Sequence, residues 1–216
     1  MVIASVVFTI LAGISVAQAQ TLRVTALGDS LTQGYGLLPD EGLVPQLQAW
    51  LTARGHDVSV LNAGVSGDTT AGGLSRLDWT LADTPDAMIV ALGGNDLLRG
   101  IDPALSRANL AGILERLASD RIPVLLVGLP APANYGPEYQ AEFEAMYPEL
   151  AAFYGVLLLP DMLAPLAARV ETGAAPIEVF QGDMIHPNRA GVGLVVEALG
   201  PQVEALLEEV RAAEGS

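Results

Sequence analysis

The stretch "RVTALGDSLTQGYG", residues 23–36, contains the feature that decides the fold. Its first five residues, Arg23–Leu27, form a short apolar run of the kind found in a buried strand. Gly28-Asp29-Ser30 follows directly, so a hydroxyl stands just after the expected strand. A serine in that position either caps the next helix or acts as a nucleophile, and the stretch alone leaves both roles open. The Gly-x-Ser-x-Gly elbow of the α/β-hydrolases is absent around Ser30.

The same arrangement continues along the chain, where apolar runs alternate with amphipathic segments. Further strands are predicted at Val58–Leu61, Ala87–Leu92, Val124–Gly128 and Val156–Leu159. Helices are predicted at Gly42–Arg54, Thr70–Ala82, Pro103–Asp120, Glu138–Tyr154 and Asn188–Ala212. This alternation predicts an α/β fold with a parallel sheet, right-handed crossovers and helices on both faces. Without repeats or linkers, residues 20–216 are expected to form a single domain.

The composition excludes several classes of function. The 216 residues carry a formal charge of −15, and all ten basic residues are arginine. Such a surface repels nucleic acid and anionic lipid headgroups, so no nucleic-acid partner is expected. Cysteine is absent, which excludes disulfides and thiolate chemistry.

The first residues resemble an export signal. No charge lies between Val2 and Ala17, and Ala17-Gln18-Ala19 matches a small-x-small cleavage site. We therefore expect a signal peptide over residues 1–19, a periplasmic or secreted enzyme, and no stable membrane insertion after cleavage. No basic residue precedes the apolar run, so a retained anchor or a buried helix is the alternative.

The ends of the predicted strands are where a ligand should bind, because parallel sheets bind ligands beyond their carboxyl edge. A nucleophilic serine needs a base there, and the chain has two histidines. His56 lies in a polar turn before a strand and is interpreted as a surface residue. His186 follows Asp183 by three residues, so one loop could deliver a base and its orienting acid to Ser30. The alternative is that Asp183 and His186 only help to start the last helix.

Donors for an oxyanion are also found after three different strands. The Ser30 N–H would point into the site if Ser30 opens a helix, and Gly67 lies in a loop where bare backbone can approach a substrate. Asn95 follows two glycines and carries a neutral NH₂ donor, although turn formation is a common role for asparagine.

These blocks resemble the GDSL, or SGNH, hydrolase family. The resemblance rests on Gly28-Asp29-Ser30-Leu31, Gly67, Gly93-x-Asn95-Asp96 and Asp183-x-x-His186-Pro187. Longer stretches resemble the bacterial periplasmic subgroup of multifunctional thioesterases, arylesterases and lysophospholipases; they are Ser66–Thr69, Gly93–Gly100, Pro132–Gly136 and Ile185–Arg189. The fold implied is a three-layer α/β/α sandwich around a flavodoxin-like, five-stranded parallel sheet.

The resemblance also implies the role of each matched residue. Ser30 would be the nucleophile, His186 the general acid–base and Asp183 its orienting partner, with Ser30, Gly67 and Asn95 as the oxyanion hole. The substrate would be a small ester or acyl thioester. The groove that binds it would be lined by Asp29, Leu97, Pro132, Asn134, Tyr135 and Ile185. The subgroup often has a bulky apolar residue where Ala131 stands, so a wider groove is expected here. Asp29 and Asp96 are expected to hold loop backbones rather than to move protons.

No cofactor or metal is expected for this chemistry, since the two histidines are far apart and no phosphate-binding glycine loop is present. Two rival functions remain open. One is a carbohydrate O-acetyl esterase with the same blocks. The other is a lipid- or glycan-binding module that has kept the fold without catalysis.

Overall fold

The central sheet of the computed structural model, which describes residues 21–214, contains five parallel strands in the order β2-β1-β3-β4-β5. The strands are β1 (Leu22–Gly28), β2 (Val58–Gly64), β3 (Ala87–Ala91), β4 (Val124–Val127) and β5 (Leu157–Leu159). All five predicted strands are found, and the order is the flavodoxin-like one. The expected signal peptide, residues 1–19, lies outside the described residues.

Four of the five predicted helices are confirmed as single helices: α2 (Leu43–Ala53), α6 (Pro103–Ser119), α7 (Pro137–Tyr154) and α9 (Arg189–Glu214). The prediction of one helix over Thr70–Ala82 is wrong. That segment forms α3 (Thr70–Ser75) and α4 (Leu77–Leu81), which meet at Arg76. The sequence prediction missed shorter elements, namely α1 (Ser30–Gln33), α5 (Gly94–Leu98), α8 (Ala164–Glu171) and the 3-10 turns η1 (Ala133–Tyr135) and η2 (Pro176–Glu178).

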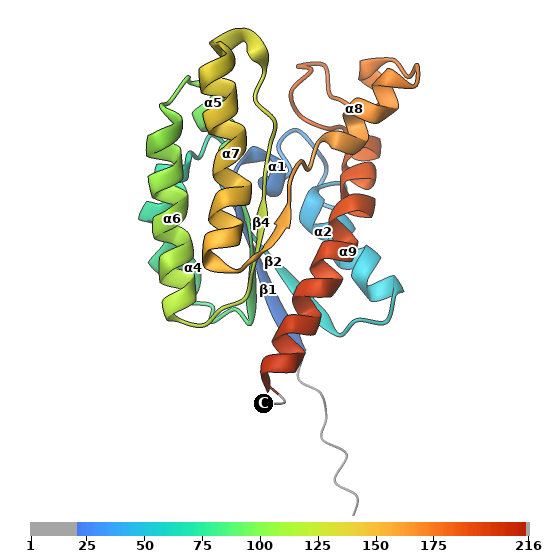
Figure 1. Cartoon of the computed structure of the whole chain (residues 1–216). Coiled ribbons are helices and arrows are strands. Elements are labelled where there is room, and N and C mark those ends of the chain that lie inside the picture. The colour runs from blue at the N-terminus through green and yellow to red at the C-terminus, as the bar shows by residue number, and fades with distance from the viewer. Residues whose placement is uncertain (1–20, 215–216) are drawn as a thin grey trace, which may run out of the picture.

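Helices cover both faces of the sheet, as Figure 1 shows. In β1, Val24 and Ala26 belong to the core shared with α2, α8 and α9. Leu27 belongs to the opposite core, which is built with α6 and α7. This alternation of side chains along a strand explains why the apolar runs have almost no inner polar residue.

The two ends of the described chain lie at the same end of the molecule (Figure 1). β1 begins there and α9 finishes there, whereas the carboxyl ends of the strands point the other way. By length and composition alone, α9 could cross a membrane. However, half of its apolar 18-residue segment is buried inside the protein. It therefore packs as the core helix of a folded domain, on the face that it shares with α2.

Candidate active site

Ser30 is the first residue of α1, immediately beyond β1. Asp29 caps this helix, since its Oδ1 accepts the Leu31 N–H at 3.0 Å. Of the two roles left open for Ser30, the helix cap is supplied by its neighbour Asp29, and the Ser30 hydroxyl is left for other partners. Gly28 makes the tight exit possible, because a Cβ there would lie 2.0 Å from Thr32 Oγ1.

His186 contacts both Ser30 and Asp183. Its Nε2 lies 2.8 Å from Ser30 Oγ, and its Nδ1 lies 2.6 Å from Asp183 Oδ2. The sequence predicted that one loop would bring the base and the acid to Ser30, and the loop does place all three within hydrogen-bond distance. The imidazole is therefore held on one side and presented to the hydroxyl on the other.

The loop around His186 is held by hydrogen bonds to its backbone N–H and carbonyl groups. Asp183 Oδ1 accepts the N–H groups of Ile185 and His186, each at 3.0 Å, and Gln181 N–H donates to the His186 carbonyl at 2.7 Å. Met184 turns the chain between them with a φ of 58°. The two backbone donors, together with the His186 ring, lower the pKa of Asp183 to about 2. The Asp183 carboxylate is therefore ionised at neutral pH.

Tyr35 is a neighbour of His186 that the sequence reasoning missed. The two rings lie 4.8 Å apart and are tilted by 41°. Gln181 Nε2 donates to the Tyr35 carbonyl at 2.8 Å, which ties this ring to the histidine loop. No pattern of residue types indicates this contact. It depends on Gly34 and Gly36, which flank Tyr35 and both have positive φ.

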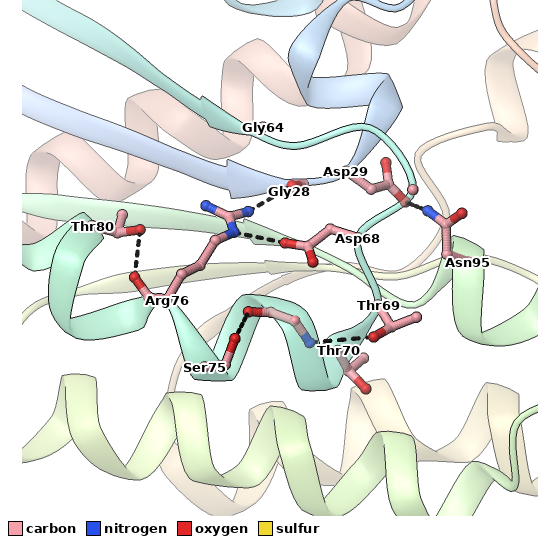
Figure 2. A network of polar contacts seen from close by, with 12 residues as sticks. Gly28, Asp29, Gly64, Asp68, Thr69, Thr70, Ser75, Arg76, Thr80 and Asn95 are labelled. Atoms are coloured by element: carbon pink, nitrogen blue, oxygen red, sulfur yellow. Dashed lines mark hydrogen bonds and ion pairs between the residues drawn. The ribbon is translucent and has the colours of Figure 1, made fainter.

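Gly67 and Asn95 lie at the same edge of the sheet as Ser30. Gly67 has a φ of 81°, and its carbonyl accepts a hydrogen bond from Arg99 Nη2 at 2.8 Å. Asn95 Nδ2 lies 3.3 Å from Asp29 Oδ2, so its amide points toward the residue before Ser30 (Figure 2). Gly93 allows this approach with a φ of 122°.

Two acids near Ser30 are buried, and both hold loops, as the sequence predicted. Burial raises the pKa of Asp29 to about 6, although its hydrogen bonds and the nearby His186 oppose the rise. Asp96 accepts from Thr70 N–H at 2.8 Å, from Thr70 Oγ1 at 2.6 Å and from Ser106 Oγ at 2.9 Å. Asp96 thereby joins the starts of α3 and α6 to α5, which carries Asn95.

A cavity of about 530 Å³ opens beside Ser30 and His186. Gly67, Asn95 and Asp29 all line it, so the structure brings the predicted site residues to one hollow. The rest of the wall is mainly apolar: Leu31, Leu97, Leu98, Leu129, Pro130, Pro132, Leu163, Phe180, Met184 and Ile185. Of the residues predicted to line a substrate groove, four are in this wall: Asp29, Leu97, Pro132 and Ile185.

Asn134 and Tyr135 are not among the residues that line this cavity. Both lie on the exposed turn η1, and Tyr135 lines a separate hollow of about 510 Å³ with Tyr139. Ala131 is also not in the wall, since it is 4% exposed and packs in the core with α6 and α7. Its small size therefore does not widen the groove beside Ser30. Leu163 and Phe180, which sequence reasoning missed, precede and follow α8, an element that it did not predict.

His56 lies apart from this site. Its Nε2 is 2.7 Å from Glu204 Oε1, so it links the turn before β2 to α9. Among the described residues, no group of three or more histidine, cysteine or acidic side chains is placed to hold a metal ion.

The fold and this arrangement define a class of protein: an α/β protein with a five-stranded parallel sheet in which a serine, a histidine and an aspartate are hydrogen-bonded in series beyond the first strand. Residues 26–194 match the profile of the GDSL-like lipase/acylhydrolase family. The chain belongs to that family, which is a family of serine esterases.

Individual relatives agree with this assignment. The chain is 39% identical to Esterase TesA of Pseudomonas aeruginosa, over 88% of this chain and 91% of that protein. It is 34% identical to Thioesterase 1/protease 1/lysophospholipase L1 of Escherichia coli, over 93% of this chain and 91% of that protein. The crystal structure of AlinE4, an SGNH-hydrolase family esterase, superposes with a TM-score of 0.71 at 42% identity and covers 88% of this chain and 99% of that one.

Proposed function

We propose that Ser30, His186 and Asp183 are the catalytic triad of an enzyme that hydrolyses carboxylic esters and thioesters with apolar acyl groups. The observation that carries the proposal is the unbroken hydrogen-bonded chain from Ser30 Oγ through both ring nitrogens of His186 to Asp183. These three hydrogen-bonded side chains supply the nucleophile, the base and the group that orients the base.

The reaction proceeds through an acyl-enzyme. His186 Nε2 takes the hydroxyl proton while Ser30 Oγ bonds to the substrate carbonyl carbon, and negative charge develops on the carbonyl oxygen. When the bond to the leaving group breaks, His186 returns the proton to the departing alcohol or thiol. Water, deprotonated by His186, then attacks the acyl-serine, and the acid is released with Ser30 restored.

The backbone N–H groups of Ser30 and Gly67 and the Asn95 amide are proposed to hold the oxyanion. All three residues line the same cavity, and Gly93 brings the Asn95 loop close. The Asn95 amide has two N–H bonds. One points to Asp29 in the structure, and the other is available for the developing charge.

The apolar wall of the cavity supports an acyl chain rather than a sugar as the bound group. Leucine, proline and phenylalanine dominate the lining, and these side chains offer no hydrogen bonds to a sugar hydroxyl. The names of the relatives cover esters, thioesters and lysophospholipids, so we propose acyl esters and acyl thioesters as the substrates. Comparing cleavage of acyl-CoAs with release of acetate from acetylated xylan separates this function from carbohydrate deacetylation.

The nucleophile is tested directly by Ser30→Ala. We expect it to lower kcat for p-nitrophenyl esters by on the order of 10⁴-fold or more, because the acyl-enzyme can no longer form. Ser119→Ala, at an exposed position at the end of α6, should leave kcat unchanged. A phosphonate ester should label the wild-type protein and not Ser30→Ala. Turnover by Ser30→Ala within tenfold of the wild type would overturn the triad and revive the non-catalytic binding module.

We also propose that the enzyme is exported and that residues 1–19 are removed. The uncharged run from Val2 to Ala17 and the small residues before Gln20 support this proposal. Mass spectrometry of the protein recovered from a bacterial periplasm should give an N-terminus at Gln20. An intact N-terminus would favour a retained anchor.

A further inference from the structure

Arg76 lies at the point where the segment predicted as one helix is divided. α3 ends at Ser75 and α4 begins at Leu77, and Arg76 between them has a φ of −106° and a ψ of 8°. Its side chain runs toward the carboxyl end of β1 (Figure 2). The side chain is only 17% exposed. A charged side chain in such a place needs partners, and these partners indicate its role.

The guanidinium joins two segments that carry site residues. Arg76 Nε donates to Asp68 Oδ2 at 2.6 Å, and Arg76 Nη2 donates to the Gly28 carbonyl at 3.0 Å (Figure 2). That carbonyl also accepts the Val65 N–H at 3.0 Å. Gly28 stands two residues before Ser30, and Asp68 stands directly after Gly67.

The surroundings of Arg76 make room for this link. A Cβ on Gly72 would lie 1.8 Å from Asp68 Oδ1, so glycine is needed for the carboxylate to reach the guanidinium. Arg76 Nη1 is buried without a hydrogen-bond partner in the described part of the chain. The position of the guanidinium is thus set by Asp68 and the Gly28 carbonyl.

We propose that Arg76 is a positioning residue which, through Asp68 and the Gly28 carbonyl, fixes the Gly67 loop relative to Ser30. The inference rests on the proposed function, since it assigns to Arg76 the spacing of two of the three oxyanion donors. Such donors act only when they lie about 2.7–3.1 Å from the oxyanion. A misplacement of a catalytic group by about 1 Å costs on the order of 10²-fold in rate. The rigid, planar guanidinium of Arg76 should therefore affect turnover through the position of these donors.

A second contact to the same loop does not replace this one. Arg99 Nη2 donates to the Gly67 carbonyl at 2.8 Å, but Arg99 lies on the exposed end of α5. It holds the outer side of the loop, whereas Arg76 and Asp68 hold the buried side, with exposures of 17% and 12%.

The test is Arg76→Lys, which keeps the charge but cannot donate to both partners in fixed directions. We expect kcat to fall by about tenfold to 100-fold, with KM within about threefold, at a temperature well below the melting point of each variant. The inhibition constant of an alkyl boronic acid, which mimics the tetrahedral intermediate, should rise by the same factor as kcat/KM falls. Arg116→Lys is the matched control, because Arg116 of α6 pairs with Asp78 of α4 at an exposed site.

Asp68→Asn is the second variant and decides the matter if Arg76→Lys does not fold. It removes the negative charge that pairs with Arg76 and changes the size of the side chain little, and it should show the same division between kcat and KM. If both variants fold, their effects on kcat should be less than additive. A variant that melts lower but keeps wild-type kcat and boronic acid inhibition would overturn the inference. The proposed function fails separately if the wild-type protein neither turns over esters nor reacts with a phosphonate.

Discussion

At the scale of single residues, Asp29, which directly precedes Ser30, is a buried carboxyl group with a raised pKa. It is 3% exposed and accepts the Leu31 N–H and the Asn95 amide, yet burial raises its pKa to about 6 from 3.8. The folded protein therefore holds this proton at pH values where the unfolded chain has released it. By linkage, the stability that comes from this proton is complete below about pH 4 and is lost as pH rises through 6.

Asp29→Asn should therefore become more stable than the wild type as pH rises. A pKa change from 3.8 to about 6 corresponds to about 3 kcal/mol, so the free energy of unfolding of the variant should gain about that much over the wild type between pH 4 and pH 8. Urea titrations at the two pH values measure it. Asp40→Asn, at an exposed turn residue, is the control and should show no such gain. An equal response of both variants to pH would contradict the assignment of a raised pKa to Asp29.

The residues of the site were predictable to different degrees. Ser30, Gly67, Asn95 and His186 could be assigned to one edge because each follows a strand or precedes a helix, and a parallel sheet brings such positions together. The Asn95–Asp29 contact and the packing of Tyr35 on His186 could not be predicted. They depend on glycines with positive φ and on side-chain rotamers, which no pattern of residue types encodes.

At the scale of elements, the packing of α2 on α9 depends on glycine. A Cβ on Gly200 of α9 would lie 2.7 Å from three ring atoms of Trp50 in α2. The Trp50 ring cannot retreat easily, because it is 8% exposed and Arg54 covers it at 3.4 Å from the ring centroid. Pro201, which follows, further restricts any side chain added at position 200.

Gly200→Ala should lower the free energy of unfolding by about 1–3 kcal/mol, since overpacking outweighs the better helix propensity of alanine. Gly193→Ala in the same helix is the control. Its Cβ would meet only Gln46 Oε1 at 3.5 Å, and the substitution should raise stability by up to about 1 kcal/mol. Thermal or urea unfolding of the two variants measures the contrast. Equal stability would show that Trp50 moves freely.

The elements also show where sequence reasoning reaches its limit. Short apolar runs predicted the five strands, and amphipathic segments predicted the four long helices, because burial sets the period of apolar residues in each. The break at Arg76 was not predictable from that period, since it results from contacts of its side chain with Asp68 and Gly28. α8 has only eight residues and was not among the predicted helices.

At the scale of the whole molecule, the formal charge of −15 affects which substrates arrive quickly. An acyl-CoA carries several negative charges and is repelled by the protein, whereas a neutral p-nitrophenyl ester is not. Raising ionic strength from about 0.01 M to about 0.15 M shortens the screening length from about 30 Å to about 8 Å. The repulsion should then weaken at the distances over which encounter occurs.

We expect kcat/KM for an acyl-CoA to rise by about three- to tenfold over this range of salt, and kcat to change little. The p-nitrophenyl ester of the same acyl chain is the control and should be nearly insensitive. Initial rates at substrate concentrations below KM measure both values. A matched rise for the two substrates would indicate a general effect of salt on the enzyme instead.

The position of the two chain ends, at the side opposite the carboxyl edge of the sheet, has a practical consequence. A linker, tag or solid support joined ahead of β1 or after α9 is attached on the face remote from the Ser30 cavity. Either end can therefore serve for immobilisation or fusion while bulky acyl donors still reach the serine from solution.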